Sequence, residues 1–339
     1  MLPVTRLAEW LYEDGIGEAR AALIEDDEIV EIGLEWDGSG PRFGAILAAR
    51  LIRKADVTGR ALALLEDGSE VLLDAAPARL TEGATLLVEI VRESIAERGR
   101  LKPAKARPAQ PGAVAVSGLS LRDRILATGT SVTEILAHQP DRLEQHGWSE
   151  RIEQARTGDI AFDWGALQMA VTPAMTLFDV DGILPRDELA RRGADASARM
   201  IRLFGIGGSI GIDLPTLESK AARQAAAAAL DAVLPQPFER TAVNGFGFLQ
   251  VVRRRLRPSI PEMLRSDSVG ASARALLRLA ERTPGAGTRT LVAHPAITKR
   301  LEREEVWRAA LARRTGTVIA LRADPALAIS AGYVEARYS

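Results

Sequence analysis

Two apolar segments of the sequence each end in aspartate. Residues 177–181 read LFDVD, and residues 210–213 read IGID. In α/β sheets, ligands bind outside the carboxyl ends of the strands, so neighbouring strands would bring Asp179 and Asp213 to about one strand spacing of each other, ~4.8 Å. Asp181 is two residues beyond Asp179 and therefore points to the same side. The pattern predicts a cluster of carboxylates at one edge of a sheet.

Such a cluster favours a bound divalent cation, because carboxylates in a small volume repel each other unless a cation or a shared proton neutralises them. The chain has no cysteine and only three histidines, so we expect Mg²⁺ or Mn²⁺ on oxygen ligands and no zinc. Mg²⁺ held in this way usually acts on phosphates. One alternative stays open, since aspartate at a strand end is also a common helix N-cap or turn residue.

Basic residues follow the acidic segments along the chain. Lys220 comes soon after Asp213, and residues 253–257 contain four arginines, among them Arg253 and Arg255. A run of one charge is commonly a solvated surface. So close after the acidic residues, these cations could instead hold the phosphates on either side of a reacting linkage, as a metal-ion nuclease requires.

Residues 98–112, RGRLKPAKARPAQPG, are basic and rich in proline. They show no hydrophobic periodicity, which is typical of a solvated linker. The alternative is a basic arm beside a nucleic-acid groove, in which Lys102, Lys105 and Arg107 would contact phosphates.

The elements upstream of this segment are predicted to be strands. Residues 18–34 alternate apolar and polar around Asp26-Asp27, which is typical of a hairpin. Residues 43–91 contain several short apolar runs separated by Thr58-Gly59 and Asp67-Gly68, which favours a small barrel.

Downstream, the pattern predicts helices around 119–128, 131–137 and 148–157. Buried strands then alternate with amphipathic helices, which indicates an α/β sheet. We interpret residues 247–256 as a helix or helical turn, and the last ~50 residues as a small unit of strands and helices.

Composition limits the class of protein. The 339 residues suffice for two to three domains at roughly 100–200 residues each. The 44 Lys and Arg against 45 Asp and Glu exclude a globally basic nucleic-acid coat protein but allow a local basic face. The acidic N-terminal segment and the absence of ~18–20 consecutive apolar residues lead us to expect a cytoplasmic protein without a signal peptide or membrane contact.

The motifs of the chain, taken in their order along the sequence, resemble those of the ribonuclease E/G family. Residues 165–182 (GALQMAVTPAMTLFDVDG) resemble a family strand pair that ends in D-x-N, and residues 205–214 (GIGGSIGIDL) resemble its GG-apolar-D segment. Residues 245–260 (GFGFLQVVRRRLRPSI) are similar to its FGL…R-x-R-x-x-PS block. Residues 17–32, 44–94 and 292–327 resemble the family's N-terminal, OB-fold and C-terminal parts.

The resemblance implies an α/β, or α+β multidomain, fold. Its catalytic core would combine deoxyribonuclease-I-like and ribonuclease-H-like parts, with an inserted OB-fold-like β domain and a small C-terminal α/β domain. The implied divisions are residues 1–36 and 113–162 for the ribonuclease-H-like segment, 37–97 for the OB-like domain, 98–112 for a basic linker, 163–265 for the catalytic deoxyribonuclease-I-like domain, and 286–339 for the C-terminal domain.

The resemblance also implies an endoribonuclease of single-stranded RNA, such as rRNA precursors or mRNA, that leaves 5′-phosphate ends. Asp179 and Asp213 match the family's two Mg²⁺-binding aspartates, and Asp181 stands where the family has Asn. Arg240 falls at the position of a basic residue near the family's catalytic centre.

The chain departs from the family in three ways. The zinc-link cysteines after Pro258-Ser259 are absent, so no zinc-linked dimer is expected, and the oligomeric state stays open between monomer and weak dimer. The segment between the OB-like block and Asp163 is too short for a full 5′-monophosphate sensor domain. Aliphatic residues replace the base-stacking aromatic residues of the OB-like block, where each stacked base is worth about 1–3 kcal/mol.

Two other hypotheses therefore accompany the endoribonuclease. One is a catalytically weak or inactive RNA-binding protein that retains the fold. The other is a scaffold in which the aspartates are structural caps.

Overall fold

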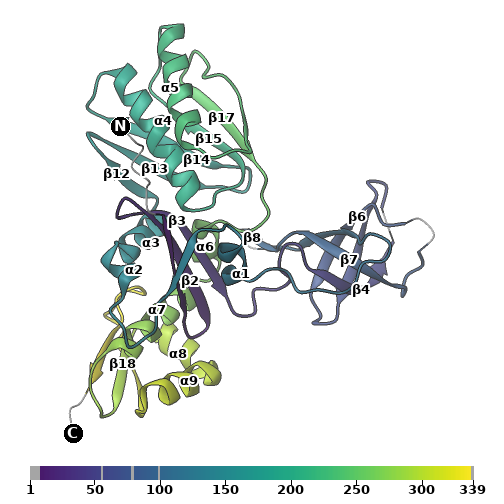
Figure 1. Cartoon of the computed structure of the whole chain (residues 1–339), viewed down its shortest axis with the longest axis vertical. Helices are drawn as coiled ribbons and strands as arrows, with labels where there is room; N and C mark the ends of the chain where they lie inside the picture. Colours follow the sequence, from purple (N-terminus) through teal and green to yellow (C-terminus); the bar gives the residue numbers. More distant parts are fainter. Residues whose placement is uncertain (1–7, 55, 78–79, 98–99, 337–339) are drawn as a thin grey trace.

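The chain folds into a mixed α/β structure with several sheets, one of which is a closed five-stranded barrel (Figure 1). This computed structural model describes residues 8–54, 56–77, 80–97 and 100–336. The first seven residues of the predicted N-terminal segment, residues 98–99 of the predicted linker and the last three of the C-terminal domain lie outside the described residues. The architecture is compatible with the expected α+β multidomain arrangement.

A four-stranded sheet forms the centre of the molecule, in the order β11-β1-β2-β3. Its strands are β1 (Glu9–Asp14), β2 (Glu18–Glu25), β3 (Glu28–Trp36) and β11 (Ser131–Glu134). The predicted hairpin is confirmed: β2 and β3 pair across Asp26 and Asp27, which both have positive φ, as a tight hairpin turn requires.

Three short helices accompany this sheet, namely α1 (Leu121–Leu126), α2 (Arg142–Gln145) and α3 (Trp148–Thr157). The prediction of a helix at 131–137 was wrong. Residues 131–134 form β11, which pairs in parallel with β1, because the β-branched Val132 and Thr133 suit an edge strand.

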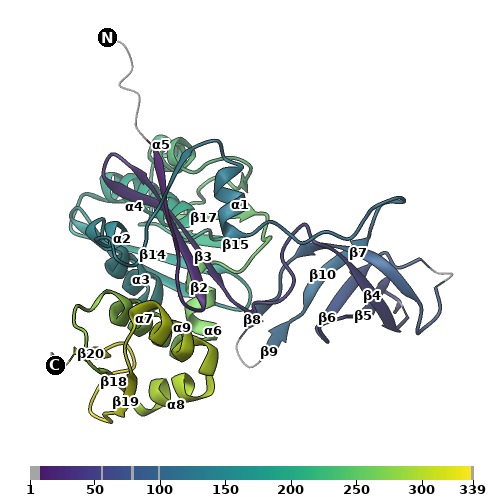
Figure 2. The ribbon, with the colours of Figure 1, turned by 60° about the horizontal axis from the view of Figure 1, so that its bottom comes forward.

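The barrel follows the order β10-β6-β5-β4-β7 and closes on itself. Its strands are β4 (Ile46–Arg53), β5 (Arg60–Leu65), β6 (Glu70–Asp74), β7 (Thr85–Arg92) and β10 (Ala104–Pro108). The predicted turns at Thr58-Gly59 and Asp67-Gly68 connect β4 to β5 and β5 to β6. The barrel projects from the body as a separate lobe with its own apolar core (Figures 1 and 2).

Over its described residues, the segment predicted as a linker at 98–112 is not free. The described part contains β9 (Arg100–Lys102), which pairs with β8 (Ile95–Glu97), and β10, which closes the barrel. Ala104 and Ala106 point into the barrel and are almost fully buried, while Lys105 and Arg107 point outward. The domain limit predicted at residue 97 therefore lies too early.

A six-stranded sheet carries the aspartates, in the order β12-β13-β14-β15-β17-β16. Its strands are β12 (Asp159–Phe162), β13 (Gly165–Val171), β14 (Thr176–Gly182), β15 (Gly208–Asp213), β16 (Glu239–Arg240) and β17 (Phe248–Arg253). β12 belongs to this sheet rather than to the predicted 113–162 segment, and the helix predicted at 247–256 is instead β17.

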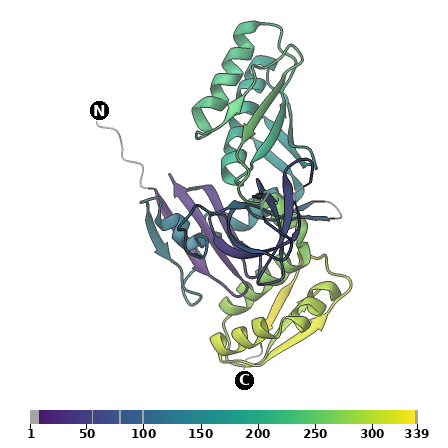
Figure 3. The same cartoon turned by 90° about the vertical axis from the view of Figure 1, so that its right-hand side faces the viewer.

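Two long helices cover one face of this sheet. They are α4 (Arg186–Leu203) and α5 (Lys220–Val233), and Figure 3 shows them together on one side of the strands. Their buried residues join the apolar face of the sheet and part of the central sheet in one core. The other face of the six-stranded sheet carries mostly exposed or half-buried side chains.

Helices α6 (Ile260–Ser266) and α7 (Ser268–Arg282) lead into the last sheet, ordered β19-β18-β20. This part contains β18 (Arg289–Ala293), α8 (Pro295–Arg303), α9 (Glu305–Thr315), β19 (Ile319–Ala323) and β20 (Tyr333–Ala336). It forms the unit of strands and helices expected at the C-terminal end. Over the described residues, no helix has the length and apolar character needed to cross a membrane.

Candidate functional site

Three aspartates share the open face of the six-stranded sheet, near the ends of β14 and β15. β14 and β15 are parallel neighbours, and Asp179 lies directly opposite Asp213 in their register. Phe178 and Val180 are buried beneath α4 and α5, whereas Asp179, Asp181 and Asp213 are exposed. The alternation of the strand thus directs Asp179 and Asp181 to the same face. We call these three residues the acidic cluster.

The turn before β17 fixes the strand ends that carry the acidic cluster. Asn244 Oδ1 accepts hydrogen bonds from the backbone N–H groups of Phe246 (2.9 Å) and Phe248 (3.0 Å). The N–H of Leu214, next to Asp213, donates to the Gly247 carbonyl at 3.2 Å. Gly247 has a φ of 96°, and a Cβ at this position would lie 2.1 Å from the Leu214 carbonyl oxygen, so only glycine fits.

The negative charges of the acidic cluster repel one another. Partial burial raises the pKa of Asp179, and the negative charges of Asp181 and Asp213 raise it further. Within the described residues, no lysine, arginine or histidine forms an ion pair with any of the three carboxylates. A bound cation would relieve this repulsion, which no ion pair among the described residues compensates.

The donor set fits Mg²⁺ or Mn²⁺. Mg²⁺ is usually bound by one or two carboxylates and completes its coordination with water and substrate phosphates. Asp179 and Asp213 supply two such carboxylates from adjacent strands. Nowhere in the described ranges do three or more His, Cys, Asp or Glu side chains come close enough to hold a metal ion by themselves. A metal here would therefore depend on water and phosphate for the rest of its ligands.

Arg240 does not join the acidic cluster. It pairs in register with Val251, whose side chain lies on the helix-covered face, while Asp213 pairs with Phe248 on the open face. The Arg240 Nε donates to Asp231 Oδ1 of α5 at 2.6 Å, and this bond raises the pKa of Arg240. The structure therefore places Arg240 on the opposite side of the sheet from the aspartates.

The arginines at and just after the end of β17 also lie away from the aspartates. Arg253 pairs with Gly208, five residues before Asp213 on β15, which is about 17 Å along a strand. Its guanidinium donates to the Ile206 carbonyl at 3.2 Å, and Arg255 forms an ion pair with Glu262. Of the residues predicted to contact RNA, only Lys220 lies at the same edge of the sheet as the acidic cluster. It is the first residue of α5.

The three basic residues predicted to contact RNA within residues 98–112 each have an acidic partner. Lys102 Nζ lies 3.3 Å from Glu97, Lys105 pairs with Asp74, and the Arg107 Nε donates to Glu89 at 2.9 Å. These pairs neutralise much of the positive charge that was predicted to contact RNA phosphates. The three cationic side chains are 32–54% exposed, so each can still exchange its acidic partner for a phosphate.

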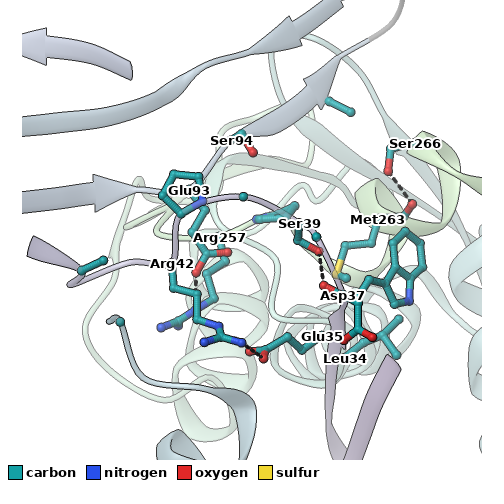
Figure 4. Close-up of a pocket in the computed structure, with 18 of the residues that line it drawn as sticks. Leu34, Glu35, Asp37, Ser39, Arg42, Glu93, Ser94, Arg257, Met263 and Ser266 are labelled. Atoms are coloured by element: carbon teal, nitrogen blue, oxygen red, sulfur yellow. Dashed lines mark hydrogen bonds and ion pairs between the residues drawn. The ribbon is translucent and has the colours of Figure 1, made fainter. Parts of the chain in front are cut away.

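A cavity of about 680 Å³ lies where the barrel joins the body (Figure 4). Two ion pairs line it, Arg42 with Glu35 at 2.7 Å and Arg257 with Glu93 at 3.1 Å. None of the predicted site residues is among its described lining residues. Because its arginines are already paired with glutamates, we interpret it as a structural junction.

Two exposed aromatic residues, Trp164 and Phe246, lie at the same edge as the acidic cluster and were not predicted as site residues. Trp164 occupies the turn between β12 and β13, and Phe246 the turn before β17. The signal in the sequence that could have identified them is an aromatic residue directly after turn-forming residues, Asp163 in one case and Asn244-Gly245 in the other.

Comparison with known proteins adds no relative: no protein-family model matches the chain, and no curated protein matches it.

Proposed function

We propose that this chain is a Mg²⁺- or Mn²⁺-dependent endoribonuclease that cleaves single-stranded RNA, such as rRNA precursors or mRNA in the cytoplasm. The observation that supports it best is the position of Asp179 opposite Asp213 on an open sheet face, without a cationic partner in the described chain. We further propose that the barrel is OB-fold-like and that the central and six-stranded sheets are the ribonuclease-H-like and deoxyribonuclease-I-like parts of the ribonuclease E/G family.

In this proposal, Asp179 and Asp213 hold the metal ion. The ion would polarise the phosphodiester and lower the pKa of a bound water. Asp181, on the same face, can accept a hydrogen bond from the attacking water and so orient it. The water oxygen bonds to phosphorus and releases a proton to solvent, while the bond from phosphorus to the 3′ oxygen breaks. That oxygen takes up a proton from solvent, which leaves a 5′-phosphate and a 3′-hydroxyl.

One observation favours the alternative of a weak or inactive RNA-binding protein. Arg240, which the resemblance assigns to the catalytic centre, is bound to Asp231 on the helix-covered face. A reaction centre without this guanidinium has fewer positive charges to stabilise the transition state.

Incubation of the purified protein with end-labelled single-stranded RNA, with Mg²⁺ or with EDTA, separates these functions. The proposal expects products only with Mg²⁺, and the downstream product should be degraded by a 5′-phosphate-dependent exonuclease. Binding that weakens steeply with salt, without Mg²⁺-dependent products, would favour the alternative. If the protein neither binds nor cleaves RNA at low salt, both proposals fail.

A further inference from the structure

Three large apolar side chains are exposed at the edge of the sheet where β14 and β15 end. Ile183 and Phe246 are each 83% exposed and Trp164 is 66% exposed. The other four tryptophans of the chain are buried, with exposures of 1% to 8%. Large apolar side chains gathered in this way commonly mark a binding surface.

The two aromatic residues lie on either side of the acidic cluster. Trp164 immediately precedes β13, and its carbonyl accepts a hydrogen bond from the N–H of Ile183, just after β14. Phe246 precedes β17, whose first residue pairs with Asp213. Because the strand order is β13-β14-β15-β17, the turns that carry Trp164 and Phe246 are about three strand spacings, ~15 Å, apart, with the aspartates between them.

Folding does not explain why these residues are aromatic. Trp164 has a φ of 66°, a conformation that favours glycine or asparagine and is unfavourable for a bulky side chain. Its ring is mostly exposed, so the chain gains little packing from it. At Phe246, the turn is held by Asn244 through the backbone, and the phenyl ring is left in solvent.

Positive charge at the same edge complements a phosphate backbone. Arg186 begins α4 after β14, and Lys220 begins α5 after β15. Both are exposed, and in the described part of the chain neither forms an ion pair or side-chain hydrogen bond. Aromatic rings beside unpaired cations are the combination that binds single strands, in which bases stack and phosphates pair with lysine and arginine.

We infer that Trp164 and Phe246 stack on unpaired bases of a single-stranded RNA on either side of the acidic cluster. The strand then crosses this edge of the sheet from the β13 side to the β17 side, and Arg186 and Lys220 contact its phosphates. The choice of RNA as the ligand rests on the proposed function. Beyond that proposed function, the inference assigns the two residues that hold the RNA strand and requires that the bound bases be unpaired.

The test is binding of a fluorescently labelled oligoadenylate in EDTA, where no metal-dependent cleavage interferes. Trp164→Ala and Phe246→Ala should each weaken binding about tenfold, the loss expected for one stacked base. Trp164→Phe keeps a ring and should retain most of the affinity. Val306→Ala is the matched control, because it removes an exposed aliphatic side chain from α9, away from this edge, and should leave binding unchanged.

Tryptophan fluorescence gives a second readout. Since Trp164 is the exposed tryptophan, RNA should quench the wild-type emission, and Trp164→Phe should abolish that quenching. If the two alanine variants bind RNA as tightly as the wild type, the inference fails while the endoribonuclease proposal stands. If they lose binding but the wild type never cleaves RNA, the inference stands and the catalytic proposal fails. If the wild type does not bind RNA, and Ile183→Ala instead dissociates a dimer, the edge is a contact between protein copies and the inference is overturned.

Discussion

Asp213→Asn is expected to lower Mg²⁺-dependent cleavage of single-stranded RNA by about 10³-fold. The substitution keeps the size of the side chain but removes one of the two carboxylates that face each other across β14 and β15. Metal-ion stabilisation of a reacting phosphate is worth several kcal/mol, and each 1.36 kcal/mol is a tenfold change in rate. The measurement is the single-turnover rate at saturating protein with Mg²⁺.

The matched control for this variant is Asp159→Asn. Asp159 is exposed on the open face of the same sheet, but it lies on β12, two strands from Asp179, and accepts a hydrogen bond from Gln168. Its substitution should leave the cleavage rate within about twofold of wild type. A wild-type rate for Asp213→Asn would contradict the assigned role, as would equal losses in both variants.

Arg20→Ala is expected to lower the free energy of unfolding by about 3–5 kcal/mol. Arg20 is 1% exposed on β2, and its guanidinium lies 2.6 Å from Glu13, which is 2% exposed. The same guanidinium pairs with Asp141 and lies over the ring of Trp148 at 5.2 Å. Removing Arg20 leaves the buried Glu13 and the half-buried Asp141 to share the charge of Arg282. This loss of positive charge costs far more than the loss of an exposed ion pair.

Urea denaturation followed by circular dichroism measures this effect, with Arg156→Ala as the control. Arg156 pairs with Glu153 one turn away on α3 and is 28% exposed, so its loss should cost less than about 1 kcal/mol. Equal unfolding midpoints for the two variants would show that the ion pairs of Arg20 contribute no more to stability than a surface ion pair.

The hairpin turns and the convergence of Asp179 with Asp213 could be predicted because they depend on local patterns. Asp26-Asp27 and Asp67-Gly68 between apolar runs specify turns without information from the rest of the chain. An apolar strand that leads through a helix into another apolar strand favours a parallel pair, and the acidic residues then follow at the same edge.

The positions of the basic residues could not be predicted, because they depend on register and strand direction. A shift of one residue moves a side chain to the other face of a sheet, and Arg240 falls on the face of Val251 rather than that of Phe248. β17 runs antiparallel to β15, so Arg253 at its end lies far from Asp213.

Two of the incorrect predictions arose because short segments are ambiguous. In residues 247–256, the Val-Val pair is followed by arginines, a pattern that fits an amphipathic helix as well as a strand, and pairing with β15 decides the outcome. In residues 98–112, the prolines and charges conceal the alternation of Ala104 and Ala106, which are small but fully able to line a barrel.

Anomalous diffraction from crystals soaked with Mn²⁺ tests the central claim most directly. We expect one strong peak bound by a carboxylate oxygen of Asp179 and one of Asp213, and we expect it to vanish in Asp213→Asn crystals treated in the same way. A wild-type crystal without a peak between these two aspartates at saturating Mn²⁺ would contradict the account.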